Sequence, residues 1–364
     1  MCSSDLLYMN EMVIGVPREV RDFEGRIALT PEAVATLVSA GSRVLIEQDA
    51  GVLSGFSNEQ YQQAGAEIVP DAAALYGGAT LIVKVKEPQR SELPLLRKDH
   101  LLFCYLHLAA DLALMESLRA IGLTAIAFET VEVDGLLPLL TPMSVIAGKL
   151  SVQIGTRLLH QPEQGKGVLL GGLEGVDPGH VVVLGGGVAG EAAISVAAGL
   201  GARVTVLERS EVRIEQLEAK YPGIRGVLST PEQIAQQVAT ADLLVGAVLV
   251  RGDRAPKLVT EVMIQSMEPG SVVVDISVDQ GGCIETIHPT TYQAPTYSVD
   301  GVTHFAVTNM PGAVPRTASQ ALSAEILPWV SILSGAAWQK DATLLNGINV
   351  EGGEVVYPVL KALV

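Results

Sequence analysis

The amino-acid sequence predicts an α/β protein with two domains, each built on a mainly parallel sheet. The chain has 364 residues, which is long for one hydrophobic core, so two domains are expected. Apolar, β-branched runs alternate with helical segments in both halves, as they do in parallel sheets with crossover helices. A hydrophobic fraction of 48% against 18% charged residues favours a well-buried globular protein or an oligomer.

In the first half of the chain, strands are predicted at VIGVP, RVLIEQ and ATLIVKVK, and a further apolar run reads LLFCYLHL. A helix opens at Thr30-Pro31-Glu32, because threonine is a favourable N-cap and proline suits the first helical position. Another helix is expected near Asn58 to Ala66. The expected hinge lies in residues 137–150, where two prolines interrupt apolar runs before a helix that begins near Ser144.

The second half of the chain repeats the alternation of strands and helices. Further strands are predicted at 243–250, 271–279 and 304–309. After the last of these, the segment from Thr317 to Trp338 has helical periodicity. Its apolar face would consist of Leu322, Ile326, Trp329 and Leu333. This helix could return to the first domain.

The most informative segment is 181–208, which reads VVVLGGGVAGEAAISVAAGLGARVTVLE. An apolar run enters a glycine-rich turn, an alanine-rich helix follows, and a second strand from Arg203 to Leu207 ends at Glu208. This is the dinucleotide-binding fingerprint in its required context, with an acidic residue about 20 positions after the turn. A glycine turn that merely reverses the chain is the alternative, but the flanking strands and the acid favour nucleotide binding.

Each glycine of the fingerprint has a distinct physical role. Gly185 permits the tight turn, Gly187 lets the backbone approach a pyrophosphate, and Gly190 lets the helix pack closely on the strand. The N-terminus of the helix presents free N–H groups to the anion. Glu208 stands where a carboxylate would accept hydrogen bonds from the adenosine ribose.

The formal net charge of −16 argues against nucleic acid or an anionic membrane surface as a partner. An anionic small molecule would therefore need its own local cations. No apolar run approaches the roughly 18–20 residues of a membrane span. Residues 1–11 carry no basic region before their short apolar piece, so they predict a loose extension and no signal peptide.

Cysteine usage predicts a reduced, cytoplasmic compartment. Cys2, Cys104 and Cys283 are too few and too scattered for a disulfide framework or a zinc site. No metal site is expected.

Three cationic residues could hold an anionic substrate. Arg26 follows a glycine and precedes an apolar run, and its planar guanidinium suits a carboxylate; the alternative is an ordinary surface arginine. Lys84 and Lys86 fall on one face of a predicted strand, because side chains alternate with a period of two. They could instead be residues of an edge strand.

Two further positions could transfer or orient protons. His107 ends an apolar run, and the near-neutral pKa of histidine suits proton transfer, although a buried core histidine is the alternative. Asp279 closes the predicted strand 271–279, with Asp275 on the same face. Carboxylates at the C-terminal end of such a strand lie beside the ligand crevice. Either aspartate could instead cap the Gly281-Gly282 turn.

Together these segments resemble the NAD-dependent alanine dehydrogenases, from Val13 to the C-terminus. The matching motifs are GVPREV, GRIALTP, LIVKVKEP, LHLAAD, ETV, LPLLTPMS, GVLLGG, VVVLGGGVAG, GAVLVRGDRAPKLV, VDISVDQGGC, PTTY and NMPGAVPRT. The resemblance implies two Rossmann-like domains and a homohexamer. The substrate domain would comprise residues 12–143 and 318–364, and the NAD-binding domain residues 144–317.

The resemblance also assigns residue roles. Arg26 and Lys86, rather than Lys84, would bind substrate, and His107 and Asp279 would be catalytic. Contacts with NAD would come from Ser144, Gly185, Gly187, Val188, Ala189, Gly190, Glu208, Arg209, Ala247, Val248, Leu249, Asp279, Asn309 and Met310.

One departure from the family pattern concerns the choice of cofactor. Family members usually have aspartate where this chain has Glu208, and Arg209 follows it. The longer acid still disfavours a 2′-phosphate, whereas an adjacent arginine can accommodate one. The sequence predicts NAD.

The implied reaction is the reversible oxidative deamination of L-alanine to pyruvate and ammonia. One alternative is a related dehydrogenase acting on another amino acid, of the lysine or saccharopine type. The other is a nucleotide-binding subunit like that of proton-translocating transhydrogenase, which the LHL histidine and the KVK lysine disfavour.

Overall fold

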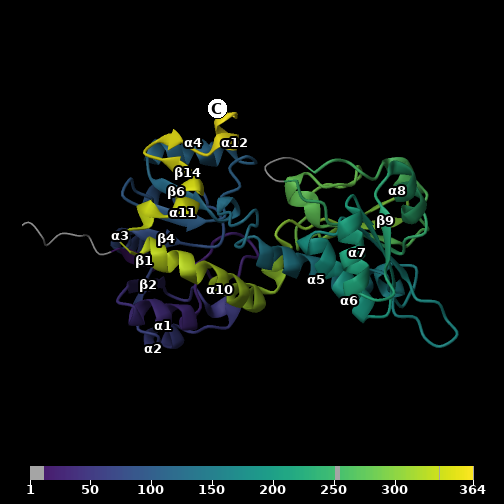
Figure 1. Ribbon diagram of the computed structural model, residues 1–364. Helices are drawn as coiled ribbons and strands as arrows, with labels where there is room; N and C mark the ends of the chain where they lie inside the picture. Colours follow the sequence, from purple (N-terminus) through teal and green to yellow (C-terminus); the bar gives the residue numbers. More distant parts are fainter. Residues whose placement is uncertain (1–11, 251–254, 336, 364) are drawn as a thin grey trace, which may run out of the picture. The chain divides into compact units, whose positions relative to one another are not determined.

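The computed structural model describes residues 12–250, 255–335 and 337–363, which fold into two compact units (Figure 1). Unit 1 comprises Met1–Pro142 and Gly312–Val364, and unit 2 comprises Met143–Pro311. The predicted extension of residues 1–11 lies outside the described residues. The chain passes from unit 1 to unit 2 inside the helix α5 (Thr141–Leu158).

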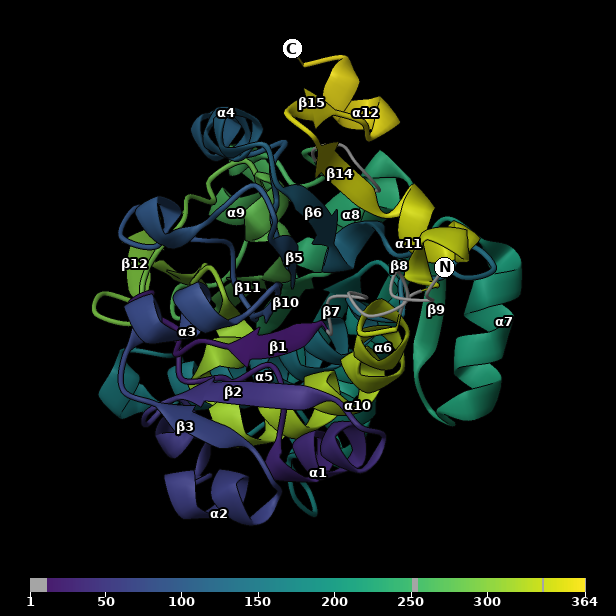
Figure 2. The same ribbon diagram turned by 90° about the vertical axis from the view of Figure 1, so that its left-hand side faces the viewer.

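Unit 1 is built on an eight-stranded sheet in the order β15-β14-β6-β5-β4-β1-β2-β3. Its strands are β1 (Val13–Val16), β2 (Arg43–Glu47), β3 (Glu67–Val69), β4 (Leu81–Val83), β5 (Leu101–Cys104), β6 (Thr124–Ala127), β14 (Ile348–Glu351) and β15 (Glu354–Val355). The first six are parallel, in the doubly wound order 3-2-1-4-5-6. Figure 2 shows β14, from the C-terminal end of the chain, beside β6, with which it pairs in the antiparallel sense.

The helices of unit 1 come from both ends of the chain. They are α1 (Pro31–Ser39), α2 (Asn58–Gln63), α3 (Ala72–Gly78), α4 (Leu112–Ile121), α10 (Pro315–Leu333), α11 (Ala342–Asn346) and α12 (Pro358–Lys361). The predicted start of α1 is confirmed, since the Thr30 side chain accepts from the N–H of Ala33. α10 packs against α1 in this unit. Its buried face contains Val330 where Trp329 was expected; the tryptophan is only half-buried.

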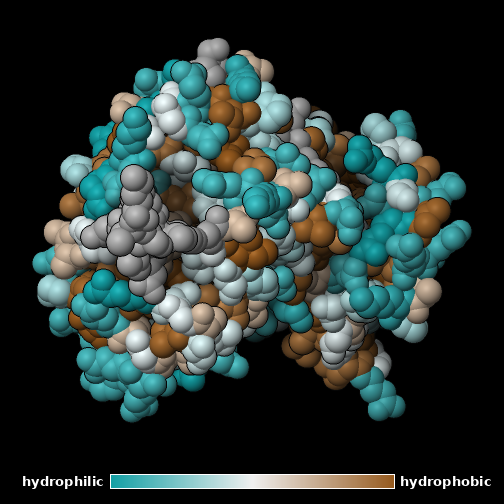
Figure 3. Space-filling model, turned by 60° about the vertical axis from the view of Figure 1, so that its left-hand side comes forward, coloured by the Kyte–Doolittle hydropathy of each residue, from teal (hydrophilic) through white to brown (hydrophobic). Residues whose placement is uncertain are grey.

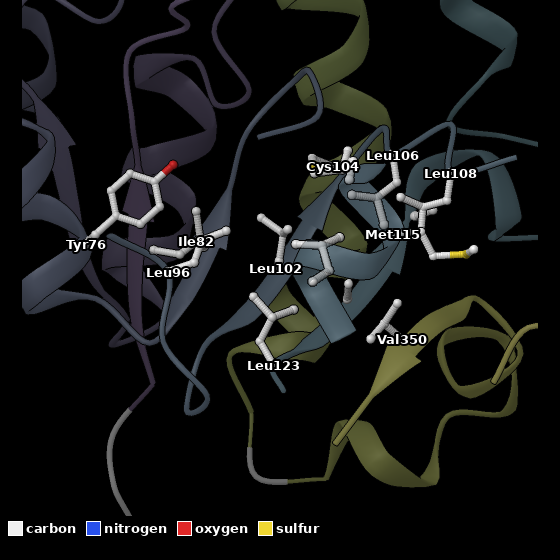
Figure 4. Packing of buried hydrophobic residues seen from close by; sticks show 14 of the residues in the cluster. Tyr76, Ile82, Leu96, Leu102, Cys104, Leu106, Leu108, Met115, Leu123 and Val350 are labelled. Carbon is white, nitrogen blue, oxygen red and sulfur yellow. The ribbon is translucent and has the colours of Figure 1, made fainter. Parts of the chain in front are cut away.

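One hydrophobic core joins the sheet of unit 1 to its C-terminal strand. Leu102 of β5, Leu123 before β6 and Val350 of β14 are all fully buried and point toward one another (Figure 4). Met115 of α4 covers the same cluster. Each such side chain contributes roughly 1.5–3 kcal/mol of transfer free energy, so the C-terminal segment is part of this domain's core.

Unit 2 is built on a seven-stranded sheet in the order β12-β13-β11-β10-β7-β8-β9. Its strands are β7 (His180–Leu184), β8 (Arg203–Glu208), β9 (Arg225–Leu228), β10 (Leu243–Gly246), β11 (Val272–Asp275), β12 (Thr296–Val299) and β13 (Val302–Phe305), and its further helices are α6 (Val188–Gly199), α7 (Glu211–Lys220), α8 (Pro231–Val238) and α9 (Glu261–Gln265). Only β12 is antiparallel, and the six parallel strands again follow the order 3-2-1-4-5-6. The predicted fold class is confirmed.

Several predicted strands end earlier than expected. β4 ends at Val83, so Lys84 and Lys86 follow the strand, and β11 ends at Asp275, so Asp279 lies in the 3₁₀ helix η5 (Ile276–Gln280). β10 likewise stops at Gly246 rather than residue 250, and β13 is Val302–Phe305 rather than 304–309. After β4 and β11, side-chain carboxylates accept hydrogen bonds from backbone N–H groups. Glu19 accepts from the N–H of Val85, and Asp275 accepts from the N–H of Ser277. Local side-chain bonds of this kind compete with the sheet ladder.

The surface of the molecule is mixed in polarity. Hydrophilic residues predominate on the face drawn in Figure 3, with hydrophobic residues between them in small groups. Within the described ranges, no helix is both long and apolar enough to cross a membrane. Cys104 and Cys283 are buried and unpaired. The same residues contain no group of three or more histidine, cysteine or acidic side chains able to hold a metal ion.

Candidate active site and nucleotide site

Unit 1 places the predicted substrate residues where three neighbouring parallel strands end. Arg26 lies in the segment after β1, Lys86 after β4 and His107 after β5, and the strands are adjacent in the order β5-β4-β1. The carboxyl ends of parallel strands share one edge of a sheet, and this is the edge where α/β folds bind ligands. Each of the three residues contacts a carboxylate: Glu24 for Arg26, Glu87 for Lys86 and Glu129 for His107.

Arg26 is buried, so the alternative of a surface arginine is wrong. Its side chain is 2% exposed, and Nε donates to Glu24 Oε1 at 2.7 Å while Nη2 donates to Glu24 Oε2 at 2.5 Å. Burial opposes the charge, but the bonds to Glu24 outweigh it and raise the pKa of Arg26. The bidentate pair fixes the plane of the guanidinium.

The two lysines of the KVK motif have different environments. Lys84 is fully buried and donates to both carboxylate oxygens of Glu92 at 2.8 Å. Its Nζ also lies 3.5 Å from Glu19, and these carboxylates outweigh burial to raise the pKa of Lys84. Lys84 is therefore committed to an internal ionic network, as a buried charge must be.

Lys86 lies beside carboxylates at the end of the sheet. Glu19 Oε1 accepts from the backbone N–H of Val85 at 2.6 Å and from that of Lys86 at 3.4 Å. The Nζ of Lys86 is 3.5 Å from Glu87 Oε2, and that oxygen is buried without a hydrogen-bond partner. Burial tends to raise the pKa of Glu87, but the charges of Lys86, Arg21 and His107 lower it.

His107 has a constrained backbone and a half-exposed ring. Its φ is +49°, which is uncommon for a residue other than glycine, and Glu129 Oε1 accepts from the His107 N–H at 2.6 Å. The same oxygen lies 3.8 Å from Nδ1. The ring stacks on Tyr105 and is 45% exposed, so the alternative of a buried core histidine is wrong.

In unit 2, the glycine-rich turn joins β7 to α6 in a form that fits a pyrophosphate. A Cβ added to Gly190 would lie 1.8 Å from the carbonyl oxygen of Gly185, so only glycine permits this close packing. A Cβ at Gly187 would meet nothing within 4 Å, and Gly187 caps α6 without any side-chain bond. The backbone is thus open to an anion at a helix N-terminus, which is how such turns bind phosphate.

Glu208, at the end of β8, is bonded to the turn itself. Its Oε2 accepts from the N–H of Gly186 at 2.7 Å, and its Oε1 accepts from the N–H groups of Arg209 and Ser210 at 2.7 and 3.2 Å. The carboxylate is therefore fixed beside the glycine turn. A carboxylate in this position is favourable for ribose hydroxyls and repels a 2′-phosphate.

Asp275 and Asp279 do not lie on one face of a strand, as the sequence predicted, because β11 ends at Asp275 and Asp279 lies in the 3₁₀ helix. Asp275 is buried, and its carboxylate accepts from the N–H groups of Ser277 and Cys283, both at 2.8 Å. Burial raises its pKa against these bonds. Asp275 therefore caps the 3₁₀ helix and the Gly281-Gly282 turn, which confirms the capping alternative for this aspartate, while Asp279 is carried on that helix.

The Gly246-Ala247-Val248-Leu249 segment after β10 is tied to the same 3₁₀ helix. The N–H of Val248 donates to Ser277 Oγ at 3.0 Å. The turn predicted to contact the cofactor and the segment that carries Asp279 are therefore linked by one serine.

The remaining predicted cofactor residues lie at the same end of unit 2. Ser144 is in the first turn of α5, one turn before Gly148, and a Cβ on Gly148 would come within 2.1 Å of the carbonyl oxygen of Ala189 in α6. Asn309 follows β13 with φ +65°, and Met310 is buried. The segments after β7, β8, β10, β11 and β13 thus all contribute predicted cofactor residues.

Sequence reasoning missed four carboxylates or hydroxyls that hold the predicted residues. Glu24, Glu87 and Glu129 contact the substrate-side residues, and Ser277 joins two cofactor segments. Glu24 and Glu87 are close in sequence to Arg26 and Lys86, and this short spacing could have predicted their ion pairs. Glu129 follows a different strand, so only the sheet order reveals its contact with His107.

Two doubly wound units, one with a glycine turn at the start of a helix, define a two-domain α/β protein of the dinucleotide-binding class. The family models for the N-terminal and C-terminal domains of "Alanine dehydrogenase/PNT" match residues 15–147 and 151–358. The chain belongs to this family.

Individual relatives agree with the family match. The chain is 47% identical to an alanine dehydrogenase of Halomonas elongata, with 95% of each chain covered, and 48% identical to that of Bacillus subtilis, with 95% and 93% covered. A solved L-alanine dehydrogenase superposes with a TM-score of 0.93 at 50% identity, covering 97% of this chain and 100% of the other. A transhydrogenase from Sinorhizobium meliloti gives a TM-score of 0.81 at 26% identity, covering 95% and 99%.

Proposed function

We propose that this protein is an L-alanine dehydrogenase that interconverts L-alanine and pyruvate plus ammonia with NAD. The observation that carries the proposal is the combination of an open glycine turn in unit 2 with Arg26, Lys86 and His107 at one sheet edge of unit 1. Near-full-length identity of 44–48% to alanine dehydrogenases supports the choice of substrate.

Arg26 and Lys86 are proposed to bind the substrate. The guanidinium of Arg26, oriented by Glu24, suits a carboxylate, and the ammonium of Lys86 suits the carboxylate or the keto oxygen. When bound, NAD supplies the hydride acceptor for the Cα hydrogen of alanine. Two fixed cations hold the substrate in one orientation, and orientation accounts for much of the rate of such a reaction.

His107 and Asp279 are proposed to handle the proton transfers. Oxidation of alanine gives an imine, which must take up water and release ammonia. His107 has a ring accessible to solvent and a carboxylate, Glu129, beside Nδ1, which are the features of a proton shuttle. Asp279 would orient the water or the ammonia.

The cofactor is proposed to contact the residues of unit 2 predicted above. The N–H groups at the start of α6, on Val188 and Ala189, would bind the pyrophosphate, and Glu208 the adenosine ribose. The proposed set is completed by Ser144, Gly185, Gly187, Gly190, Arg209, Ala247, Val248, Leu249, Asp279, Asn309 and Met310. Because Glu208 is already fixed beside the turn, NAD is proposed rather than NADP.

The physiological form is proposed to be a cytoplasmic homohexamer with small molecules as its partners. The acidic chain and its unpaired buried cysteines are compatible with that compartment. Size-exclusion chromatography with light scattering tests the assembly, and a mass of one or two chains would contradict it. Within each chain, unit 1 is proposed to bind the substrate and unit 2 to bind NAD.

One assay tests the reaction. Oxidation of NADH is followed with ammonia and a panel of 2-oxo acids that includes pyruvate and larger acids. Pyruvate is expected to give the highest kcat/KM, and reduction of NAD by L-alanine is expected in reverse. Preference for a larger 2-oxo acid would favour the lysine or saccharopine type, while nucleotide binding without any deaminating activity would favour the transhydrogenase-like alternative.

A further inference from the structure

Arg213, on α7, holds the glycine turn from the side of the neighbouring helix. Its Nε donates to the carbonyl oxygen of Gly186 at 2.8 Å. Its Nη2 donates to Glu191, in the first turn of α6. One guanidinium therefore fixes both the turn and the helix that begins after it.

Gly186 is held through both of its backbone groups. Its N–H donates to Glu208 at 2.7 Å, and its carbonyl accepts from Arg213. A Cβ at Gly186 would approach Leu217 of α7 to 2.6 Å, so the turn lies directly on that helix. With Gly186 fixed in this way, the N–H groups that follow it are set in one orientation.

The partner of Arg213 is itself anchored. Glu191 accepts from Lys220 Nζ at 2.6 Å and from the hydroxyl of Tyr221 at 3.2 Å. Burial tends to raise the pKa of Glu191, but the bonds from Lys220 and Arg213 lower it. The carboxylate is therefore ionised near neutral pH, and its bond with Arg213 is charge-assisted.

We propose that Arg213 is a positioning residue for the cofactor, which together with Glu191 holds the glycine turn in the conformation that accepts a pyrophosphate. The inference rests on the nucleotide binding proposed above. A turn that is already ordered binds its ligand at a lower entropic cost. Loss of the arginine should therefore weaken nucleotide affinity and leave the reaction of the bound substrate unchanged.

The test compares Arg213→Ala, Arg213→Lys and Glu191→Gln with the control Arg225→Met, at an exposed arginine at the start of β9. Affinity is measured by NADH fluorescence and by calorimetry with ADP, which needs no turnover. Arg213→Ala is expected to raise both dissociation constants and the KM for NADH about ten- to hundredfold, the usual effect of losing a charge-assisted bond. At saturating NADH, kcat and the KM for pyruvate should stay within about threefold.

The other variants distinguish the planar geometry of the Arg213 guanidinium from its positive charge. Lysine at 213 retains the charge but has no planar fork to reach two partners, so it should restore little affinity. Glu191→Gln should weaken binding less than Arg213→Ala, and it carries the test if the alanine variant does not fold. Arg225→Met removes a cation of unit 2 outside this network and should change affinity by less than about threefold.

Some outcomes would overturn the role of Arg213. Unchanged affinity for NADH and ADP in a folded Arg213→Ala protein would contradict the proposed role. If the melting temperature of this variant also falls, Arg213 stabilises the fold and does not position the cofactor. Full rescue by lysine would also contradict it. If the unmodified protein binds neither nucleotide, the proposed function fails first, and the role of Arg213 fails with it.

Discussion

The two units share one strand order but differ in the segment that follows their first strand. In unit 1, β1 leads into a segment with Glu19, Glu24 and Arg26, all buried. In unit 2, β7 leads into the glycine turn at Gly185 and Gly187. Both segments leave the sheet at the same topological position, where ligands bind in doubly wound folds.

The difference shows that chemistry on this scaffold is set by the loop and not by the fold. Unit 1 uses buried side-chain charges, which need partners such as Glu92 for Lys84. In unit 2 the proposed binding groups are backbone N–H groups, which need glycines and a helix end. The predictions below test whether the two units divide the work in this way, and they are arranged from the largest expected effect to the smallest.

The largest effect is expected at the histidine of unit 1. His107→Ala should lower turnover about 10²–10⁴-fold, the range for a lost general acid or base. Because His107 belongs to unit 1, the dissociation constant for NADH should change by no more than a few-fold. Steady-state kinetics and NADH fluorescence measure the two quantities.

His160→Ala is the matched control for this change. His160 is exposed and lies in unit 2, so turnover should be unaffected. Near-native turnover of His107→Ala would remove the histidine from the mechanism, and a large loss of NADH affinity would contradict the division between the units.

A second effect separates the two lysines of the KVK motif. Lys86→Met should lower kcat/KM for pyruvate about ten- to hundredfold, through loss of a charge-assisted contact with substrate, with little change in melting temperature. Lys84→Met leaves Glu92 and Glu19 without their cation, so it should lower the free energy of unfolding by about 3–5 kcal/mol. Kinetics and thermal denaturation of both variants measure this. Equal kinetic losses at equal stability would show that Lys86 has no special role.

A third effect belongs to unit 2 and concerns the cofactor. The wild-type protein should favour NADH over NADPH by at least about tenfold in kcat/KM, or roughly 1.4 kcal/mol. Glu208→Ser should narrow that ratio, because it removes the charge that repels a 2′-phosphate. Glu211→Ser, which removes an exposed acid from the start of α7, is the control. Equal use of both cofactors by the wild type would contradict the assignment of Glu208.

Sequence reasoning predicted the elements of this fold better than their ends. The start of α1 followed from Thr30 and Pro31, and the glycine turn from its flanking strands, because these signals are local. The early end of β11 depends on a carboxylate that accepts from Ser277 and Cys283, and no periodicity reveals such a contact.

The same distinction applies to the candidate site. The positions of Arg26, Lys86 and His107 after an apolar strand or a glycine made them candidates, and only the family resemblance selected them and preferred Lys86 to Lys84. The partners that orient them were not recognisable, because Glu129 and Glu19 reach them from other segments of the chain. Long-range hydrogen bonds depend on the sheet order, which the sequence did not supply.

The smallest effect is a pH dependence that should arise in unit 1, from Glu19. Burial raises the pKa of this carboxyl from 4.5 to about 7, against the charge of Lys84 and with the help of Glu24 and Glu92. Between these two values the folded protein retains a proton that the unfolded chain has lost. The contribution of Glu19 to stability is therefore complete below about pH 4.5 and is lost as the pH rises through about 7, with a slope of at most about 1.4 kcal/mol per pH unit.

Glu19→Gln tests this expectation, because glutamine retains an oxygen that can accept from the Val85 N–H but does not titrate. The free energy of unfolding of both proteins, measured by urea denaturation from pH 5 to pH 8, gives a difference curve. Stability of the wild type relative to the variant should fall as the pH rises toward 7 and then level off. Glu325→Gln, an exposed acid of α10, should give a flat curve. A flat difference curve for Glu19→Gln as well would mean that Glu19 is ionised throughout this range, with Lys84 neutralising two buried carboxylates. Any pH dependence of the stability of unit 1 would then have to come from another group.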